Sequence, residues 1–357
     1  MAFFSVNNIS VKGIAAAVPK GELSNWDYNY ISEQERKLLI KTTGVEKRRM
    51  VFNTGITTTD LCKAAAEKLL EKTGTSKEDI SILVFVSQTP DYFLPASSVT
   101  LQNRLGLPKT CMAFDINLGC SGYVYGLSAI SSIMSVGKMK KGLLLCGDIS
   151  SAGPPEEDKS VFPLFGDGGT ATLLQYDPLP PNGGEVATMH FSNQSDGSGY
   201  EAIIVREGGM RKPFTVDSFT MVEKEKGISR ASRNLELNGM AVFNFSVTEV
   251  PKNITEFFSL TGTNPDYYDY FVMHQANLLM NETIRKKLKF PPEKVPYSIS
   301  KYGNTSSASI PLTIISELRE KVSGNVSWLL SGFGVGLSWA TVSLKTTGLV
   351  CPEIIEI

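Results

Sequence analysis

Residues 113–127 read AFDINLGCSGYVYGL, and this stretch decides what kind of fold the chain can adopt. Its first part completes the segment Met112–Ile116, which predicts a strand. Its second part opens the segment Cys120–Val136, which is rich in small residues and carries no charge. Such a segment predicts a helix that is buried on nearly all sides. A strand that leads directly into a buried helix is typical of an α/β protein.

A similar order of elements occurs twice along the chain. The earlier part predicts helix Thr59–Thr73, strand Ile80–Val86, helix Ala96–Leu105, strand Met112–Ile116, helix Cys120–Val136, and strands Gly142–Cys146 and Gly169–Gln175. The later part predicts helix Met240–Leu260, kinked or divided at Pro251, strand Tyr270–Met273, helices Gln275–Leu288 and Ser306–Val322, and strands Val326–Leu330 and Leu337–Lys345. We therefore predict two pseudo-duplicated halves, residues 1–180 and 181–357, joined by a Pro- and Gly-rich connector, Asp177–Gly184.

The charge balance argues against several kinds of partner. Lys and Arg number 35 and Asp and Glu number 36, so no overall positive charge points to nucleic acid. No secretory signal is visible, and no apolar run approaches the ~20 residues that span a bilayer. We predict a soluble, cytoplasmic protein with no nucleic-acid or membrane partner. One tight basic cluster, Lys47–Arg49, is open to two interpretations: a solvated turn, or a contact for an anionic ligand.

Only one of the five cysteines lies at a position that favours a catalytic nucleophile. Their odd number and their spacing match neither a disulfide framework nor a zinc site, so we expect free thiols. Cys120 alone lies between a strand and a helix start, where free N–H groups and partial positive charge favour a thiolate. Cys120 is therefore the candidate nucleophile. The others are expected to be small buried hydrophobes: Cys62, Cys111, Cys146 and Cys351.

A histidine and an asparagine are candidates to meet this cysteine. His274 ends the strand Tyr270–Met273, at the edge where active sites of α/β proteins gather, although it could also be a hydrogen-bonded strand end. His190 lies in a strand-like run without charged neighbours and is expected to be structural. Asn304 is either a helix N-cap or a site residue, because the helix after it corresponds to the one that Cys120 opens in the first half.

Two glycine-rich stretches are candidate loops around a site. SGFGVGLSW (Ser331–Trp339) lies between two strands and could turn backbone N–H groups toward a ligand, or it could be an ordinary hairpin. LFGDGGTA (Leu164–Ala171) predicts a tight turn that Asp167 holds in place. The polar stretch Asn193–Lys212 predicts a surface excursion around the site entrance.

Five motifs together resemble the 3-oxoacyl-(acyl carrier protein) synthase III family of the thiolase superfamily. They are AFDINLGCSGYVYGL, MHQAN, KYGNTSSASIP, LFGDGGTA and SGFGVGLSWA, and the similarity runs from Thr42–Met50 to the last strand. The resemblance implies an α/β, thiolase-like, five-layered αβαβα fold of two similar halves, and a homodimer. It also implies a Cys-His-Asn triad, whose members are Cys120, His274 and Asn304.

The same resemblance implies further roles. The backbone N–H groups of Cys120 and Val335 form an oxyanion hole. Leu94 matches a position that reaches into the partner subunit's pocket. The expected substrate pocket has four side chains: Phe333, Phe165, Leu94 and Asn277.

The implied activity is acyl transfer followed by decarboxylative Claisen condensation. Cys120 takes the acyl group from acyl-coenzyme A or an acyl carrier protein. A malonyl-type thioester then binds, and His274 and Asn304 donate hydrogen bonds to its thioester oxygen. Loss of CO₂ leaves an enolate that attacks the acyl-cysteine. This chemistry needs no metal and no cofactor.

Four positions depart from the family pattern. Leu38 and Thr42 stand where a tryptophan and an arginine bracket the adenine in well-studied members. Asn244 and Leu279 stand where two basic residues are linked to carrier-protein docking, which leaves Arg285–Lys287 as the candidate basic patch for an acidic carrier. We therefore expect a specialised member, in secondary metabolism or surface-polysaccharide modification, rather than a housekeeping initiator of fatty acid synthesis.

Two alternatives stay open at this point. The altered delivery surface is also consistent with acyl transfer to an oxygen or nitrogen acceptor without decarboxylation. A non-enzymatic alternative is a partner subunit of a heterodimeric synthase, against which the nucleophile Cys120 argues. A hydroxymethylglutaryl-coenzyme A synthase-like reaction is disfavoured because the matching motifs supply no glutamate base.

Overall fold

The computed structural model describes residues 2–178 and 186–357 of the protein. The connector expected over Asp177–Gly184 therefore lies outside the described residues from position 179 onward. Within the two described ranges, no helix is both long and apolar enough to cross a membrane.

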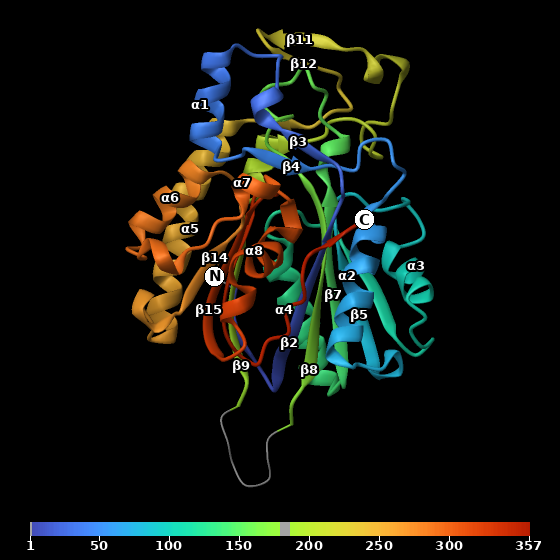
Figure 1. The fold of residues 1–357 in the computed structure, drawn as a ribbon, viewed down its shortest axis with the longest axis vertical. Coiled ribbons are helices and arrows are strands. Elements are labelled where there is room, and N and C mark those ends of the chain that lie inside the picture. Colours follow the sequence, from blue (N-terminus) through green and yellow to red (C-terminus); the bar gives the residue numbers. More distant parts are fainter. Residues whose placement is uncertain (1, 179–185) are drawn as a thin grey trace.

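A six-stranded mixed sheet forms one side of the core (Figure 1). Its strands, in spatial order, are β17 (Ile355–Glu356), β2 (Ile9–Val18), β8 (Asp167–Tyr176), β7 (Lys141–Ile149), β5 (Ile80–Val86) and β6 (Met112–Ile116). The predicted bounds of β5 and β6 are confirmed. Strand β5 pairs in parallel with both β6 and β7, so the carboxyl ends of these three strands lie at one edge of the sheet.

A five-stranded sheet forms the other side. Its strands, in spatial order, are β1 (Ala2–Asn7), β9 (Thr188–Ser195), β16 (Ser338–Thr347), β15 (Asn325–Gly334) and β14 (Tyr270–Met273). Strand β1 was not among the predicted elements, and it pairs antiparallel with β9, far along the chain. Strands β1 and β17 thus each complete the sheet that the opposite part of the chain builds. The division at residue 180 stays a prediction.

Helices cover and separate the two sheets. The outer face of the six-stranded sheet carries α2 (Thr58–Thr73) and α3 (Ser97–Arg104), and the outer face of the five-stranded sheet carries α5 (Gly239–Thr261) and α6 (Leu278–Lys287). Between the sheets lie α4 (Gly122–Gly137) and α8 (Ser309–Leu318), which contact strands of both (Figure 1). The expected α/β fold of five αβαβα layers is therefore confirmed.

The buried environment of α4 is confirmed and has a steric basis. Tyr123, Val124 and Leu127 belong to the hydrophobic cluster between the sheets. A Cβ atom on Gly126 would lie 2.7 Å from a methyl group of Val86, so only glycine lets the helix pack this closely on β5. This packing fixes the start of α4, and with it the position of the cysteine that precedes the helix.

Shorter elements join these layers. The other helices are α1 (Glu33–Thr43) and α7 (Ile299–Tyr302), and the short strands are β3 (Glu22–Ser24), β4 (Lys47–Arg49), β10 (Ile203–Ile204), β11 (Val222–Glu225), β12 (Ile228–Arg230) and β13 (Glu236–Leu237). The 3₁₀ turns are Asn25–Asp27, Lys77–Asp79, Ser150–Ala152, Gly197–Ala202, Val216–Phe219, Pro265–Tyr267, Pro292–Lys294, Ser306–Ala308 and Arg319–Lys321.

Two predicted helices of the later part differ in the structure. The helix predicted over Ser306–Val322 is divided into a 3₁₀ turn, α8 and a second 3₁₀ turn, because Ser306 has a left-handed φ of 49° that an α-helix cannot contain. By contrast, α5 runs through Pro251 as one helix, so the prediction of a second helix starting there was wrong.

Both interpretations of the basic cluster Lys47–Arg49 were wrong. The Arg48 side chain is fully buried and donates hydrogen bonds to the carbonyl oxygens of Phe162 (2.6 Å) and Phe165 (3.0 Å). Its neighbours form ion pairs, Lys47 with Glu22 and Arg49 with Glu356. Backbone carbonyls from the loop before β8 thus satisfy a cation that sequence alone assigns to the surface.

Candidate active site

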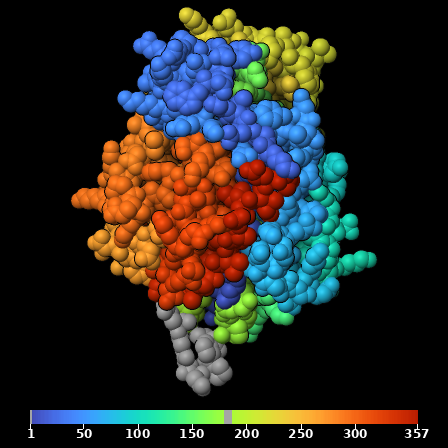
Figure 2. All heavy atoms as spheres, in the orientation of Figure 1, coloured from blue at the N-terminus to red at the C-terminus, as the bar shows by residue number. Residues whose placement is uncertain are grey.

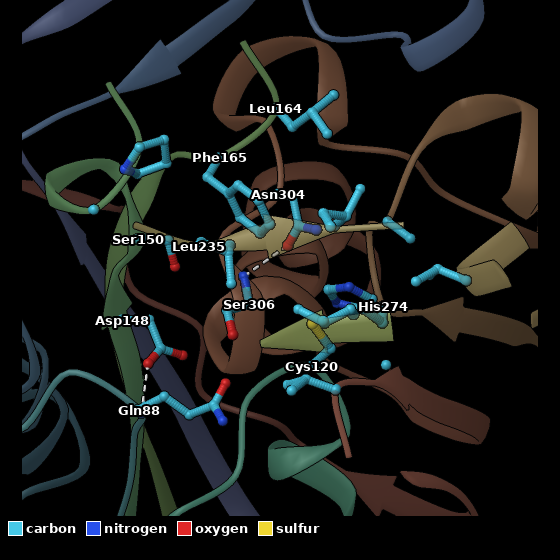
Figure 3. Close-up of a pocket in the computed structure, with 18 of the residues that line it drawn as sticks. Gln88, Cys120, Asp148, Ser150, Leu164, Phe165, Leu235, His274, Asn304 and Ser306 are labelled. Atoms are coloured by element: carbon cyan, nitrogen blue, oxygen red, sulfur yellow. Dashed lines mark hydrogen bonds between the residues drawn. The ribbon is translucent and has the colours of Figure 1, made fainter. Parts of the chain in front are cut away.

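One cavity of about 500 Å³ lies where the carboxyl ends of the parallel strands meet the second half of the protein (Figure 3). Its wall includes all three members of the expected triad, Cys120, His274 and Asn304. Of the other expected site residues, four also line the cavity: Phe165, Asn277, Phe333 and Val335. Leu94 does not line it and is instead 83% exposed on the surface of this chain.

Cys120 lies just before α4, whose N-cap is Ser121. The side chain is almost fully buried, and burial, followed by the negative charge of Asp148, raises the pKa of the thiol to about 11. The backbone N–H groups of Val335 and Cys120 itself face the sulfur and lower the pKa, but by less than burial raises it. The expectation that the helix start alone favours a thiolate was therefore wrong, because desolvation of the charged form outweighs it.

The glycine-rich end of β15 and the turn that follows it lie directly against this cysteine. A Cβ atom on Gly334 would lie 2.9 Å from the Cys120 sulfur, and one on Gly332 would lie 3.0 Å from the Cys120 carbonyl oxygen. Gly334 also has a φ of 156°, which other residues rarely adopt. The turn is thus more than an ordinary hairpin, because its glycines let the backbone N–H of Val335 approach the sulfur.

His274 follows β14, and hydrogen bonds hold both its ring and its backbone carbonyl group. Its Nδ1 atom lies 2.7 Å from the Ser309 hydroxyl, and its carbonyl oxygen accepts a hydrogen bond from Asn281 at 2.9 Å. The ring meets Phe333 edge-on, with centroids 5.6 Å apart. Burial lowers the pKa of His274 to about 3, and the backbone of Ser306 opposes this only in part. The imidazole is therefore neutral at physiological pH.

Asn304 is a cavity residue and not a helix N-cap. Its side-chain oxygen accepts a hydrogen bond from the Ser306 N–H at 2.9 Å, but the N-cap of the turn Ser306–Ala308 is Thr305, so the N-cap interpretation was wrong. Its backbone bonds to Leu164 and Gly166 on the glycine-rich turn before β8 (2.9 and 3.1 Å). Because the oxygen is occupied, the amide nitrogen is the atom that remains to donate toward a ligand.

The turn before β8 has its own anchor. The Asp167 carboxylate is fully buried and accepts hydrogen bonds from the Val51 N–H (2.9 Å) and the Ser151 N–H (3.0 Å). The expectation that Asp167 holds this loop is confirmed.

Two further residues of the site were missed at the sequence level. Asp148, at the end of β7, is buried and accepts hydrogen bonds from the Gln88 N–H (2.7 Å) and from the N–H and hydroxyl of Ser307 (3.2 and 2.9 Å). The hydroxyl of Ser306 interacts with both the Cys120 thiol and the Asp148 carboxylate, and it lies between them in Figure 3. A charged residue at the end of an otherwise apolar strand was the available signal for Asp148.

Residues expected to be structural lie away from the cavity. His190, in β9, bonds through Nδ1 to Ser5 at 2.7 Å and stacks on Phe3. All five cysteines are free, as expected, and Cys120 alone among them lines the cavity. In the described residues, no group of three or more His, Cys, Asp or Glu side chains could hold a metal ion.

The positions expected at the docking surface do not line the cavity. Leu38 and Leu279 are exposed, at 63% and 50%. The basic patch predicted over Arg285–Lys287 was wrong for Arg285, which is buried in an ion pair with Glu282, whereas Lys286 and Lys287 are exposed. The predicted excursion near the entrance is confirmed in part, because residues 203–205 line the cavity.

Comparisons with known proteins agree with this architecture. Sequence models described as 3-oxoacyl-[acyl-carrier-protein] synthase III and as its C-terminal region match residues 114–197 and 259–346. A β-ketoacyl-[acyl-carrier-protein] synthase III of Streptococcus sanguinis is 31% identical over 344 residues, covering 94% of this chain and 99% of the relative.

Solved structures agree as well. A 3-oxoacyl-(acyl-carrier protein) synthase from Burkholderia xenovorans superposes with a TM-score of 0.91 at 36% identity, covering 99% of both chains. The priming β-ketosynthase of the R1128 polyketide pathway superposes with a TM-score of 0.82 at 25% identity, covering 97% of this chain and 98% of the other. The chain therefore belongs to the 3-oxoacyl-[acyl-carrier-protein] synthase III family of condensing acyltransferases and shares its thiolase-like fold.

Proposed function

We propose that Cys120, His274 and Asn304 catalyse acyl transfer to the cysteine followed by decarboxylative condensation with a malonyl-type thioester. The observation that carries this proposal is that these three side chains line one cavity although 154 residues (274 − 120) and 30 residues (304 − 274) separate them. The two substrates share the cavity in turn, since one nucleophile must first be acylated and then attacked.

In the first half-reaction the Cys120 sulfur attacks the acyl thioester. Because its pKa is about 11, the thiol loses its proton as the S–C bond forms, and the proton goes to the departing thiolate of the donor. The N–H groups of Cys120 and Val335 face the sulfur and are the donors for the tetrahedral oxyanion. One such donor typically contributes about 3 kcal/mol to the transition state.

The second half-reaction requires His274 in its neutral form, with a hydrogen on the ring nitrogen that faces the substrate. We infer that Ser309 donates its hydroxyl proton to Nδ1 of His274, which leaves Nε2–H to donate to the malonyl thioester oxygen. The amide nitrogen of Asn304 is the second donor. These two bonds stabilise the enolate that forms as the C–C bond to the carboxylate breaks and CO₂ leaves. The enolate carbon then attacks the acyl-cysteine, and the Cys120 sulfur departs.

We infer that the donors are thioesters of coenzyme A or of an acyl carrier protein, in line with the names of the relatives. A cytoplasmic homodimer is part of the proposal. The neighbouring side chains Phe93 and Leu94 are 91% and 83% exposed on this chain, an arrangement that a partner subunit would cover.

We also propose a specialised role, such as priming a secondary pathway, rather than housekeeping fatty acid synthesis. The support is the exposed apolar side chains of Leu38 and Leu279, where the family pattern has a tryptophan and a basic residue for thioester delivery, together with the likeness to a priming ketosynthase of a polyketide pathway. The same two positions also favour a second candidate, acyl transfer to an oxygen or nitrogen acceptor without loss of CO₂.

One experiment separates the two candidates. The protein is incubated with an acyl thioester and carboxyl-labelled malonyl thioester, while Cys120 is followed by mass spectrometry and labelled CO₂ is counted. Condensation requires a Cys120 adduct and one CO₂ per product, with Cys120→Ser as the control that removes the adduct. Turnover without CO₂ release would instead establish the acyl-transfer candidate.

A further inference from the structure

Arg233 is the only lysine or arginine among the described residues that line the active-site cavity. It lies shortly before β13, in the segment that forms the upper end of the molecule in Figures 1 and 2. The cavity wall near it in sequence is apolar, with Leu235 and Leu237. Arg233 is itself exposed, so an anionic ligand that enters the cavity from solvent can reach its guanidinium and pair with it.

The guanidinium of Arg233 has no acidic partner among the described residues. Its central carbon lies 5.2 Å from the centre of the Phe219 ring, a cation–π contact that leaves the five N–H donors unused. The other arginines of this segment with a described ion pair differ: Arg230 pairs with buried Asp158 at 3.1 Å, and Arg206 pairs with Glu236 at 2.9 Å. Arg233 is thus a free cation that faces the cavity.

The backbone around Arg233 is held firmly. The side chain of Asn234, which is 4% exposed, accepts a hydrogen bond from the Ala231 N–H (2.8 Å) and donates one to the Gly153 carbonyl (2.6 Å). The N–H of Arg233 donates to the Ser218 carbonyl at 3.3 Å. These bonds fix the backbone that carries Arg233, and the contact with Phe219 is what orients the guanidinium itself.

We propose that Arg233 binds an oxyanion of the acyl thioester, a carboxylate or a phosphate, while the thioester carbonyl lies at Cys120. The proposal rests on the proposed function, since it requires that acyl thioesters occupy the cavity. Two parts of such a substrate carry an oxyanion that Arg233 could bind. One is the terminal carboxylate of a dicarboxylic acyl group, and the other is a phosphate of the coenzyme A or phosphopantetheine carrier. The planar guanidinium can bond either of them with two parallel N–H groups.

The test uses four donors that combine two acyl groups with two carriers. Acetyl and succinyl groups are each attached to coenzyme A, which has phosphates, and to N-acetylcysteamine, which has none. The rate of Cys120 acylation is measured by intact-protein mass spectrometry for the wild type and for Arg233→Gln, which keeps the polarity and loses the charge. Arg211→Gln is the matched control, because Arg211 is an exposed arginine of the same segment that does not line the cavity.

The two sources give different patterns. If Arg233 binds a phosphate, Arg233→Gln slows both coenzyme A donors by about tenfold or more and leaves the N-acetylcysteamine donors unchanged. If it binds an acyl carboxylate, both succinyl donors are slowed and both acetyl donors are unchanged. Equal rates of wild type and Arg233→Gln within twofold for all four donors would overturn the proposal.

A binding measurement separates this proposal from the proposed function. Analogues of the four donors with a methylene in place of the thioester sulfur cannot acylate Cys120, and calorimetry gives their dissociation constants. A wild type that no donor acylates contradicts the proposed function. Unchanged dissociation constants for all analogues in Arg233→Gln contradict the role of Arg233, whether or not acylation occurs.

Discussion

The Nδ1 atom of His274 lies 2.7 Å from the hydroxyl oxygen of Ser309, the first residue of α8. Ser309 is itself buried, so its hydroxyl has few other partners to choose from. With Ser309 as the donor, as proposed above, Nδ1 is the acceptor and Nε2 carries the hydrogen that is donated to the substrate.

Removing this hydroxyl is expected to impair decarboxylation more than acylation. In Ser309→Ala the neutral ring is free to adopt the tautomer that lacks a proton on Nε2, so we expect CO₂ release from a malonyl thioester to fall about tenfold or more, the value of one good hydrogen bond. Acylation of Cys120 should stay within twofold. Ser316→Ala, on the same helix, is the control, and an equal loss of both half-reactions would show a merely structural role for Ser309.

The buried histidine is expected to make stability depend on pH. Burial lowers the folded-state pKa of His274 to about 3, below the ordinary value of about 6.5, so the unfolded chain binds the proton more readily. Stability is therefore lost as pH falls below about 6.5. Between pH 7 and pH 5 the free energy of unfolding of the wild type should fall by about 2 kcal/mol relative to His274→Asn, measured by urea denaturation. Parallel pH profiles for the two proteins would contradict a buried neutral imidazole.

Neutralising Asp148 is expected to make Cys120 more acidic. The negative charge of Asp148 raises the pKa of the thiol, so Asp148→Asn should lower the midpoint of the pH profile for alkylation of Cys120 by iodoacetamide, by about one unit. Asp167→Asn is the matched control, because Asp167 is an equally buried carboxylate that holds a loop without lining the cavity. A shift of the same size in both variants would attribute the effect to loosened packing rather than to charge.

A side chain on Gly334 is expected to block acylation. In Gly334→Ala the new Cβ would lie 2.9 Å from the Cys120 sulfur, in space that the attacked carbonyl needs. We expect the rate of Cys120 acylation to fall about 100-fold or more, as measured by intact mass, because a misplaced reacting group has such an effect. Gly324→Ala, at a position with open space around it, should react like the wild type. Normal acylation of Gly334→Ala would mean that the turn can move away from the sulfur.

Strands that are buried in a parallel sheet could be predicted, because they are continuous apolar runs, and Ile80–Val86 and Tyr270–Met273 have the predicted bounds for this reason. Met112–Ile116 also has the predicted bounds, although it is a partly exposed strand at the edge of its sheet, and β1 and β2 were missed. Arg48 could not be predicted as a core residue, since its burial depends on carbonyl groups of Phe162 and Phe165, more than 100 residues away.

The candidate site also has features that could be predicted from the sequence and features that could not. That Cys120, His274 and Asn304 approach one another could be inferred from the repeated order of elements and from the motifs, and the cavity holds all three. The left-handed φ of Ser306 and the bonds of Asp148 are tertiary features of the contact between β7 and the turn Ser306–Ala308, and no local pattern reports them. The pKa of Cys120 was misjudged because the helix start is a local feature whereas desolvation belongs to the whole fold.

The pairing of β1 with β9 has a consequence for how the chain folds during synthesis. The two partners are 186 residues apart (188 − 2), so at about 5–20 residues per second the ribosome makes β9 roughly 10–40 s after β1. For that time β1 lacks its partner strand, while β2, β5, β6, β7 and β8 of the other sheet have already been made. An unpaired edge is a template for another chain, so a chaperone, or a neighbouring nascent copy, has its longest opportunity to bind at Ala2–Asn7.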